Sequence, residues 1–470
     1  MLATQNNDDT IVALSTPWGV GAIAMVRLSG KEAVRVVDGV FAGRVPLREQ
    51  PSHLQAYGRI VAEKAGTEVT IDEVMVAVHR GPHSYTGEDV VEVTCHGSPL
   101  IVREMVQLFC DRGARLAEPG EFTKRAFIHG RIDLAQAEAV CDLIQARTER
   151  ARQCAMGQLQ GKLSEEITNV QALLTEVRSL LELDIDFADD DVPAFEREKV
   201  AALLRQARDG ASKLLASFAE GHLLREGARV VLVGRTNVGK SSLLNALLRC
   251  DRAIVSELPG TTRDTLEAVV DIGGIPVTLV DTAGFGKLDS SIEQEAARRT
   301  EREVGRADLI MLVLDRSEPL SGEDERLLQR YGSPGEGQRP AMCVVNKIDV
   351  PKAWDVDQLR TFGYNLAPVE VSAKVGVGME RLREVVAQTL LGEAIAGADS
   401  VVVTNLRHQQ ALQRAVVAID RSLASLEEGL SAEFVAVDVR EASEALGTIV
   451  GAITDEDVLA EIFARFCIGK

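Results

Sequence analysis

The segment GRTNVGKS at residues 234–241 constrains the fold more than any other feature of this sequence. It follows the apolar run ARVVLV and precedes SSLLNALL, so it joins a predicted strand to a predicted helix. The pattern GxxxxGK[ST] lets backbone N–H groups surround phosphate oxygens, while its lysine reaches the β and γ phosphates and its hydroxyl ligates Mg²⁺. We therefore expect a parallel sheet wound with helices, with Lys240 and Ser241 at a bound nucleotide.

Three shorter segments follow in the order that a guanine-nucleotide site requires. DTAG at 281–284 ends the run VTLV, NKID at 346–349 ends AMCVV, and SAK at 372–374 follows VEV. The Asp349 carboxylate can accept hydrogen bonds from N1–H and the 2-amino group of guanine, and adenine lacks the second donor. Each motif alone is compatible with a simple strand-end turn. All four in this order predict GTP rather than ATP.

The segment GTTRD at 260–264 is the expected switch, ordered when the γ-phosphate is present. Thr262 is placed to complete the Mg²⁺ shell with Ser241. The residues expected to contact GTP from these loops are Val238, Gly239, Lys240, Ser241, Ser242, Thr262, Asp281, Thr282, Ala283, Gly284, Asn346, Lys347, Asp349, Ser372, Ala373 and Lys374.

The residue after DTAG is unusual. Ras-like GTPases have a glutamine there that orients the attacking water. In this sequence the position is Phe285, which cannot form a hydrogen bond through its side chain. Another group must therefore position the water and neutralise charge in the transition state.

The pattern of apolar and polar residues divides the chain into four segments. Residues 1–118 have strand-like runs and a glycine-rich turn, and residues 119–225 have helical spacing, with Asp133 as a predicted helix cap. Residues 226–392 alternate strands with helices, and residues 393–470 return to helical periodicity. The predicted fold class is α/β plus all-α, with an α/β domain inserted into a discontinuous helical domain and a separate N-terminal domain.

Composition excludes several classes of protein. The chain of 470 residues is 46% hydrophobic and carries a net charge of −19, which argues against a protein that coats nucleic acid non-specifically. Its seven scattered cysteines form no CxxC pair, so neither a disulfide framework nor a zinc site is expected. No apolar run is long enough to span a membrane and no secretory signal is present, so we expect a cytoplasmic protein.

The motifs together resemble one family. These are GRTNVGKSSLLNALL, IVSELPGTTRD, DTAG, NKID, the ending FCIGK at 466–470, and PHSYTGED, HGS and PGEFTKRAFIHGRIDLAQAEA in the N-terminal half. The chain is similar to the MnmE (TrmE) tRNA modification GTPases over essentially its whole length. The resemblance implies an N-terminal folate-binding and dimerising domain, a helical domain of two segments and an inserted G domain. It implies modification of tRNA at carbon 5 of the wobble uridine, with an FAD-dependent partner protein, a reduced folate (5-formyl- or methylene-tetrahydrofolate) and glycine or ammonium.

The resemblance also implies site residues. A potassium ion would stand where an arginine finger stands, held by Asn237, Ser256, Leu258 and Thr261, which would also contact GTP. Glu293 would orient the water and act in catalysis with Lys240 and Thr262. The folate residues would be Arg27, Glu92, Arg131 and Lys470. The sequence has Thr236 where the family usually has proline, and Arg131 where it more often has lysine.

Several alternatives stay open on the sequence alone. Asn237 is also compatible with a simple turn residue, Glu293 with a helix surface, and the folate residues with interdomain salt bridges. The basic side chains of Lys124, Arg125, Arg147, Arg150 and Arg152 suit either tRNA phosphates or salt bridges on helices. A ribosome-assembly GTPase would share the G motifs but gives no reason for the FCIGK ending. The N-terminal domain alone would also suit a folate-dependent one-carbon transferase.

Overall fold

The computed structural model describes residues 9–186, 197–250, 267–281, 298, 300–331, 340–362, 367–392, 401–453 and 456–469. The chain forms two compact units, Met1–Cys141 with Gly447–Lys470, and Asp142–Leu446. Within the described residues, no helix is both long and apolar enough to cross a membrane. The predicted combination of α/β and all-α parts is confirmed. The exact boundaries between the domains stay a prediction.

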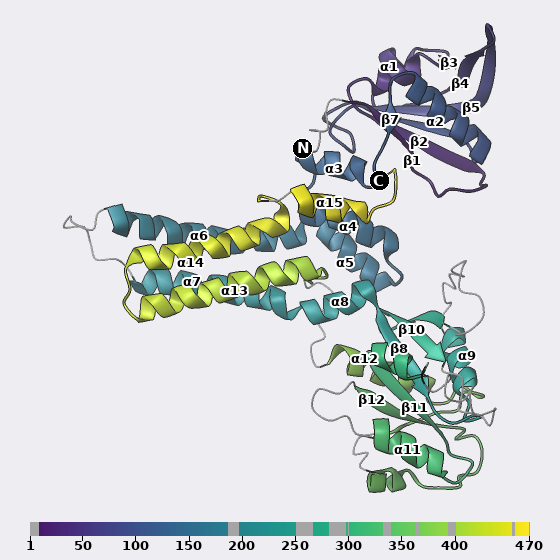
Figure 1. Ribbon diagram of the computed structural model, residues 1–470, viewed down its shortest axis with the longest axis vertical. Helices are drawn as coiled ribbons and strands as arrows, with labels where there is room; N and C mark the ends of the chain where they lie inside the picture. Colours follow the sequence, from purple (N-terminus) through teal and green to yellow (C-terminus); the bar gives the residue numbers. More distant parts are fainter. Residues whose placement is uncertain are drawn as a thin grey trace. The chain divides into compact units, whose positions relative to one another are not determined.

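The first unit is built on a seven-stranded sheet with the order β3-β4-β5-β6-β2-β1-β7 (Figure 1). Its neighbouring strands are antiparallel, except for the parallel pair β1 and β7. The strands are β1 (Ile11–Leu14), β2 (Ile23–Ser29), β3 (Phe41–Gly43), β4 (Gln55–Lys64), β5 (Thr67–His79), β6 (Val90–His96) and β7 (Arg115–Leu116). Alternate residues such as Val76 and Val93 are buried against helices α1 (Ala33–Asp38) and α2 (Pro99–Asp111), as period-2 patterning requires.

The chain's last described residues complete this unit. Helices α3 (Glu121–Ile128) and α15 (Glu456–Ala464) pack together, and the 3-10 turn η1 (Leu47–Glu49) lies beside α1. Pro119 forms a β-bridge with Ile468, and the Ser15 hydroxyl donates to the Gly469 carbonyl at 3.1 Å. Helix α4 (Leu134–Gln145) begins in this unit after Asp133, whose carboxylate accepts from Gln136 N at 2.8 Å. The predicted cap is therefore confirmed.

The second unit contains a helical bundle made from two chain segments, as predicted. Its helices are α5 (Glu149–Leu159), α6 (Lys162–Asp186), α7 (Arg197–Ala216), α8 (Phe218–Glu226), α13 (Leu406–Glu427) and most of α14 (Ala432–Val450). Helix α7 packs along both α6 and α13 (Figure 1). Helix α6 buries Leu163, Ile167, Val170 and Leu174 at helical spacing, so one apolar stripe faces the bundle.

The inserted part of this unit is a six-stranded sheet with the order β13-β12-β11-β8-β10-β9. Only β9 is antiparallel to its neighbour. The elements are β8 (Ala228–Val233), α9 (Lys240–Cys250), β9 (Glu267–Ile272), β10 (Ile275–Asp281), β11 (Leu309–Asp315), α11 (Gly322–Tyr331), β12 (Ala341–Asn346), η2 (Val356–Phe362), β13 (Val369–Glu370) and α12 (Met379–Leu391). Apolar clusters cover both faces, so central strands such as β11 are buried throughout.

Candidate functional site

The loop between β8 and α9 has the backbone that its sequence predicts. Asn237 and Gly239 have φ values of 67° and 99°, in the left-handed region. A Cβ at position 239 would lie 2.3 Å from Asn346 Nδ2, so only glycine fits beneath that amide. The loop therefore places backbone N–H groups and the N-terminus of α9 at one point, which suits a phosphate.

Lys240 lies buried at the centre of this loop. Its Nζ donates to the carbonyls of Gly234 and Arg235 at 2.7 and 2.9 Å. Burial lowers the pKa of this ammonium, and the nearby charges of Asp281 and Glu323 oppose that shift. A buried cation next to inward-facing amides is the arrangement that holds β and γ phosphates.

Ser241 and Asp281 meet beside the lysine. The Ser241 hydroxyl donates to Asp281 Oδ2 at 2.6 Å, although the two residues come from α9 and the end of β10. Asp281 Oδ1 is buried and has no hydrogen-bond partner within the part of the chain that the structure describes. A hydroxyl and a carboxylate with a free oxygen are hard oxygen donors, which fit Mg²⁺.

The predicted base-binding residues are brought together around a cavity of about 680 Å³. The Asn346 side chain donates to Val238 O at 2.9 Å and accepts from Ala373 N at 3.1 Å, so it joins three loops. The Ser372 hydroxyl donates to Asp349 Oδ1 at 2.6 Å, and this hydrogen bond is the main reason that the pKa of Asp349 is lowered. An ionised carboxylate fixed in this way can accept from two guanine donors.

Asp315 supports this site and was not predicted. Its carboxylate pairs with Lys347 Nζ at 2.6 Å, and the Lys347 backbone has a φ of 66°. Burial alone would raise the pKa of Asp315, but hydrogen bonds from Lys347 and Ser317 outweigh it, and the pKa is lowered. The available signal was that Asp315 ends the apolar run LIMLVLD, just as Asn346 ends the next strand.

The structure places three other predicted residues at the nucleotide site. Asn237 and Ser242 are exposed at the loop and at the first turn of α9. Lys374 lines the cavity. The remaining predicted residues lie outside the described residues, namely Ser256, Leu258, Thr261, Thr262, Thr282, Ala283, Gly284, Glu293 and Lys470.

A second polar site lies in the first unit. Arg27 on β2 and Glu92 on β6 are register partners, and Arg27 Nε and Nη2 donate to Glu92 Oε1 at 2.9 and 2.7 Å. The guanidinium lies 5.4 Å from the centre of the Tyr85 ring and 5.8 Å from that of Phe122. Among the described residues, Arg27 Nη1 is buried without an acceptor. That unpaired donor fits an anionic or carbonyl-bearing ligand.

Arg131 reaches the same loop. Its Nε donates to the Ser84 carbonyl at 3.1 Å, and Ser84 precedes the Tyr85 that packs on Arg27. Tyr85 and Phe122 were not predicted as site residues. Their presence in PHSYTGED and PGEFTKR was the only available signal, because their contacts with Arg27 are distant in sequence.

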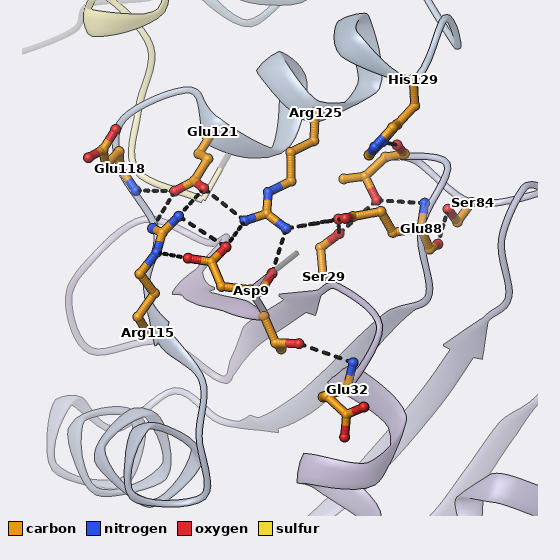
Figure 2. Close-up of polar contacts among 12 residues, drawn as sticks. Asp9, Ser29, Glu32, Ser84, Glu88, Arg115, Glu118, Glu121, Arg125 and His129 are labelled. Carbon is orange, nitrogen blue, oxygen red and sulfur yellow. Dashed lines mark hydrogen bonds and ion pairs between the residues drawn. The ribbon is translucent and has the colours of Figure 1, made fainter. Parts of the chain in front are cut away.

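A network of ion pairs and hydrogen bonds contacts this loop through Glu88 (Figure 2). Arg125 donates to Asp9 Oδ1, Glu88 Oε2 and Glu121 Oε1 at 2.7, 3.0 and 3.0 Å, and Arg115 bridges Asp9 and Glu121. Glu88 also accepts from the Ser29 hydroxyl at 2.8 Å. The Arg125 side chain is only 3% exposed, so this arginine is structural and cannot reach tRNA phosphates.

Two of the other basic residues are also paired on helices. Arg152 pairs with Glu149 along α5 at 2.6 Å. Arg150 pairs with Glu220 of α8. Both contacts favour the salt-bridge alternative for these side chains.

The buried loop lysine, the Ser241–Asp281 pair and the cavity lined by Asn346 and Asp349 define a P-loop protein that binds guanine nucleotides. Two family models match this chain: "MnmE helical domain" over residues 134–467, and "GTP-binding protein TrmE N-terminus" over residues 10–131. The tRNA modification GTPase MnmE of Geobacillus kaustophilus is 43% identical over 467 residues, covering 98% of this chain and 99% of that protein. The enzyme of the same name from Moorella thermoacetica is 42% identical over 470 residues, covering 98% and 100%. The chain belongs to the MnmE (TrmE) family of tRNA modification GTPases.

Among solved structures, the G domain of the T. maritima FeoB iron transporter is 29% identical, with a TM-score of 0.28. The match covers 34% of this chain and 98% of that domain. That score is too low to carry an argument about fold.

Proposed function

We propose that this GTPase acts with an FAD-dependent partner protein to install a carboxymethylaminomethyl or aminomethyl group on carbon 5 of the wobble uridine of tRNA. The observation that carries the proposal is that one chain combines a guanine-nucleotide site with a separate Arg27–Glu92 site suited to folate. A ribosome-assembly switch would need only the first site. The nitrogen would come from glycine or ammonium, and the reaction would take place in the cytoplasm.

The GTP site would bind two cations, Mg²⁺ and K⁺. Ser241 and Thr262 would hold Mg²⁺, and the partnerless Asp281 Oδ1 supports a water-mediated contact with that ion. Asn237, Ser256, Leu258 and Thr261 would hold K⁺, and the exposed position of Asn237 at the loop supports its part in this set. A bound potassium ion would neutralise charge that develops between the β and γ phosphates.

The chain's own residues have distinct tasks in hydrolysis. Lys240 donates to the β and γ phosphates, and Asn346 and Asp349 hold the base. Glu293 orients the attacking water, because Phe285 offers no hydrogen bond.

The proposed folate site lies in the first unit. Glu92 would accept hydrogen bonds from the amide and amino edge of the pterin, with Arg27 beside it, while Arg131 and Lys470 would face its carboxylate tail. Glu92 Oε1 is occupied by Arg27, and Oε2 lies 3.6 Å from His79 Nε2. The sheet of this unit would also form the homodimer.

Potassium dependence tests the catalytic assignment. Phosphate release should be fast in potassium and slow in sodium, because sodium is too small to contact all the proposed oxygens together. Asn237→Ala should lose the response to potassium but keep nucleotide binding through Lys240. Glu293→Ala should keep dimerisation with GDP and aluminium fluoride in potassium but hydrolyse slowly. Equal turnover of the wild type in the two salts would show that the potassium mechanism is wrong.

Nucleoside analysis of tRNA tests the overall function. A strain that lacks this protein should accumulate wobble uridine without the carbon-5 group. Complementation with the wild type should restore the group, whereas Lys240→Ala and Glu92→Ala should not. Normal nucleosides together with accumulated ribosome precursors would instead support the ribosome-assembly alternative.

A further inference from the structure

The hairpin formed by β9 and β10 has a rigid turn on the side away from Asp281. Gly273 and Gly274 have φ values of 64° and 86°, and positive values at both positions are characteristic of a type I′ turn. Asp271 Oδ1 accepts from Gly274 N at 2.7 Å, and Arg383 Nη2 donates to Asp271 O at 2.8 Å. The turn is therefore fixed to its own hairpin and to α12.

The other end of the hairpin leads to the nucleotide site. Strand β10 ends at Asp281, which accepts from Ser241, and β9 begins at Glu267, shortly after the predicted switch segment 260–264. The two strands pair without a register shift from Ile275↔Ile272 to Val280↔Glu267. At 3.3–3.4 Å per residue, β10 extends about 20 Å. One continuous, paired strand therefore connects Asp281 to the glycine turn.

The turn contacts helix α5 through Thr148. The Thr148 hydroxyl accepts from Ala151 N at 3.2 Å as the N-cap of α5, and the same hydroxyl donates to Gly274 O at 2.7 Å. A Cβ at position 274 would lie 2.8 Å from Arg150 Cβ, so the backbone of the turn and this side chain are in close contact. Arg150 in turn pairs with Glu220 of α8. One hydroxyl thus joins the start of a bundle helix to the hairpin.

The surroundings of this contact are loosely packed. A cavity of about 350 Å³ lies beside it, lined by Arg150, Gln153, Gln158, Gly273, Gly274 and Val402 among others. On the side that faces α5, the described contacts of the turn are therefore those with Thr148 and Arg150, and the cavity leaves space beside them.

We propose that the Thr148–Gly274 contact is a latch that transmits the state of the nucleotide from the β9–β10 hairpin to α5 and α8. When the nucleotide site moves Asp281, the hairpin moves its turn, and the first turn of α5 gains or loses a hydrogen-bonded partner. The inference rests on the GTPase activity and is independent of the folate and tRNA proposals. Thr148 is a positioning residue, because it lies outside the nucleotide site.

Three substitutions of Thr148 separate the latch from the helix cap. Thr148→Ser keeps both hydrogen bonds. Thr148→Asp keeps an acceptor for Ala151 N but has no proton for Gly274 O, so it removes the latch alone. Thr148→Val removes both bonds and shows the effect of losing the cap.

Backbone hydrogen exchange of the full chain provides the test, with GDP compared with GDP and aluminium fluoride in potassium. In the wild type and Thr148→Ser, exchange at residues 149–153 should differ between the two states by about fivefold, the factor expected for one ordinary hydrogen bond. In Thr148→Asp the difference should vanish, while GTP turnover stays close to the wild-type value.

Two results would overturn the latch. One is a wild type that hydrolyses GTP but shows no state-dependent exchange in α5. The other is a Thr148→Asp variant that keeps the full difference. Phosphate release from the same samples reports on the GTPase activity separately, so a failure of the latch is not confused with a failure of hydrolysis.

Discussion

In the second unit the candidate nucleotide site is assembled from loops at the carboxyl ends of parallel strands, whereas the candidate folate site of the first unit lies across antiparallel strands. Each loop of the nucleotide site carries a short motif, and backbone atoms such as Val238 O and Ala373 N join the loops. The candidate folate site depends on side chains that meet from distant positions, as Arg27 and Glu92 do. The loops of the nucleotide site are therefore held by local contacts, whereas the Arg27–Glu92 site depends on elements that are distant in sequence.

The largest effect is expected from removing Arg125, which joins Asp9, Glu88 and Glu121 in the first unit. Arg125→Met should destabilise the first unit by about 3 kcal/mol, because the largely buried Glu88 carboxylate loses its cation, while Asp9 and Glu121 keep their pairs with Arg115. Hydrogen exchange of the β1 and α3 amides measures the change. Arg103→Met, at an exposed position of α2, is the matched control and should stay within about 0.5 kcal/mol. Equal exchange in the two variants would show that the network is not needed for stability.

Removing the charge of Lys240 should lower GTP turnover while the protein stays folded. Lys240→Ala should lower GTP turnover by about 10²–10³-fold, since one preorganised donor to the transition state is lost. Phosphate release under saturating GTP measures this effect. Glu92→Ala serves as the control in the other unit and should turn over GTP normally. A comparable loss in both variants would mean that the two sites are not separate.

The preference for guanine over xanthine tests whether Asp349 binds the base in the cavity. Asp349→Asn should weaken GTP binding, because guanine loses hydrogen bonds to a charged acceptor, and should favour xanthosine nucleotides. Titration with both nucleotides gives the preference. Ser372→Ala, which leaves the carboxylate in place, should weaken GTP binding less and keep the preference for guanine. An Asp349→Asn variant that still prefers GTP would contradict the assignment of NKID.

The folate site should show a smaller effect. Glu92→Ala should weaken binding of 5-formyltetrahydrofolate by about 1–3 kcal/mol, because donors of the bound pterin are left unpaired. The substitution also frees Arg27, so Glu92→Gln is a useful companion that keeps one acceptor. Calorimetry on the full chain gives both affinities. Unchanged affinity in Glu92→Ala would remove this residue from the site.

Low pH should destabilise the first unit by protonating carboxylates that pair with Arg115 and Arg125. Burial alone would raise the pKa values of Asp9 and Glu121, but hydrogen bonds from Arg115 and Arg125 outweigh it and hold both below their usual 3.8 and 4.5. Carboxylates with lowered pKa values stabilise the folded state fully above those usual values, and the contribution is lost as pH falls through the lowered ones. Protection of the α3 amides, relative to the exchange rate of an unfolded chain at the same pH, should therefore fall below pH 4, and Arg125→Met should show a weaker dependence on pH.

Most of the nucleotide site could be predicted because each motif ends a strand of one parallel sheet, and topology then brings those ends together. The prediction found Asn346, Asp349 and Ser372 but missed Asp315, whose role depends on a side-chain contact with Lys347. In the first unit the alternation of strands was visible, but the aromatic neighbours of Arg27 were not. Neither was the pairing of Arg125 with Asp9, because an ion pair between positions 116 residues apart leaves no local pattern.

The bridge between Pro119 and Ile468 has a consequence for the order of folding. The first unit combines residues from both ends of the chain, so it cannot be completed until the whole second unit has been synthesised. At 5–20 residues per second this interval is on the order of tens of seconds. Throughout it the start of α3 lacks its final cover, since a Cβ at Gly120 would lie 2.7 Å from the Phe463 carbonyl in the finished protein. A chain released before residues 456–469 are made would therefore lack the contacts that cover the start of α3, and we expect that segment to be cleaved by proteases more readily.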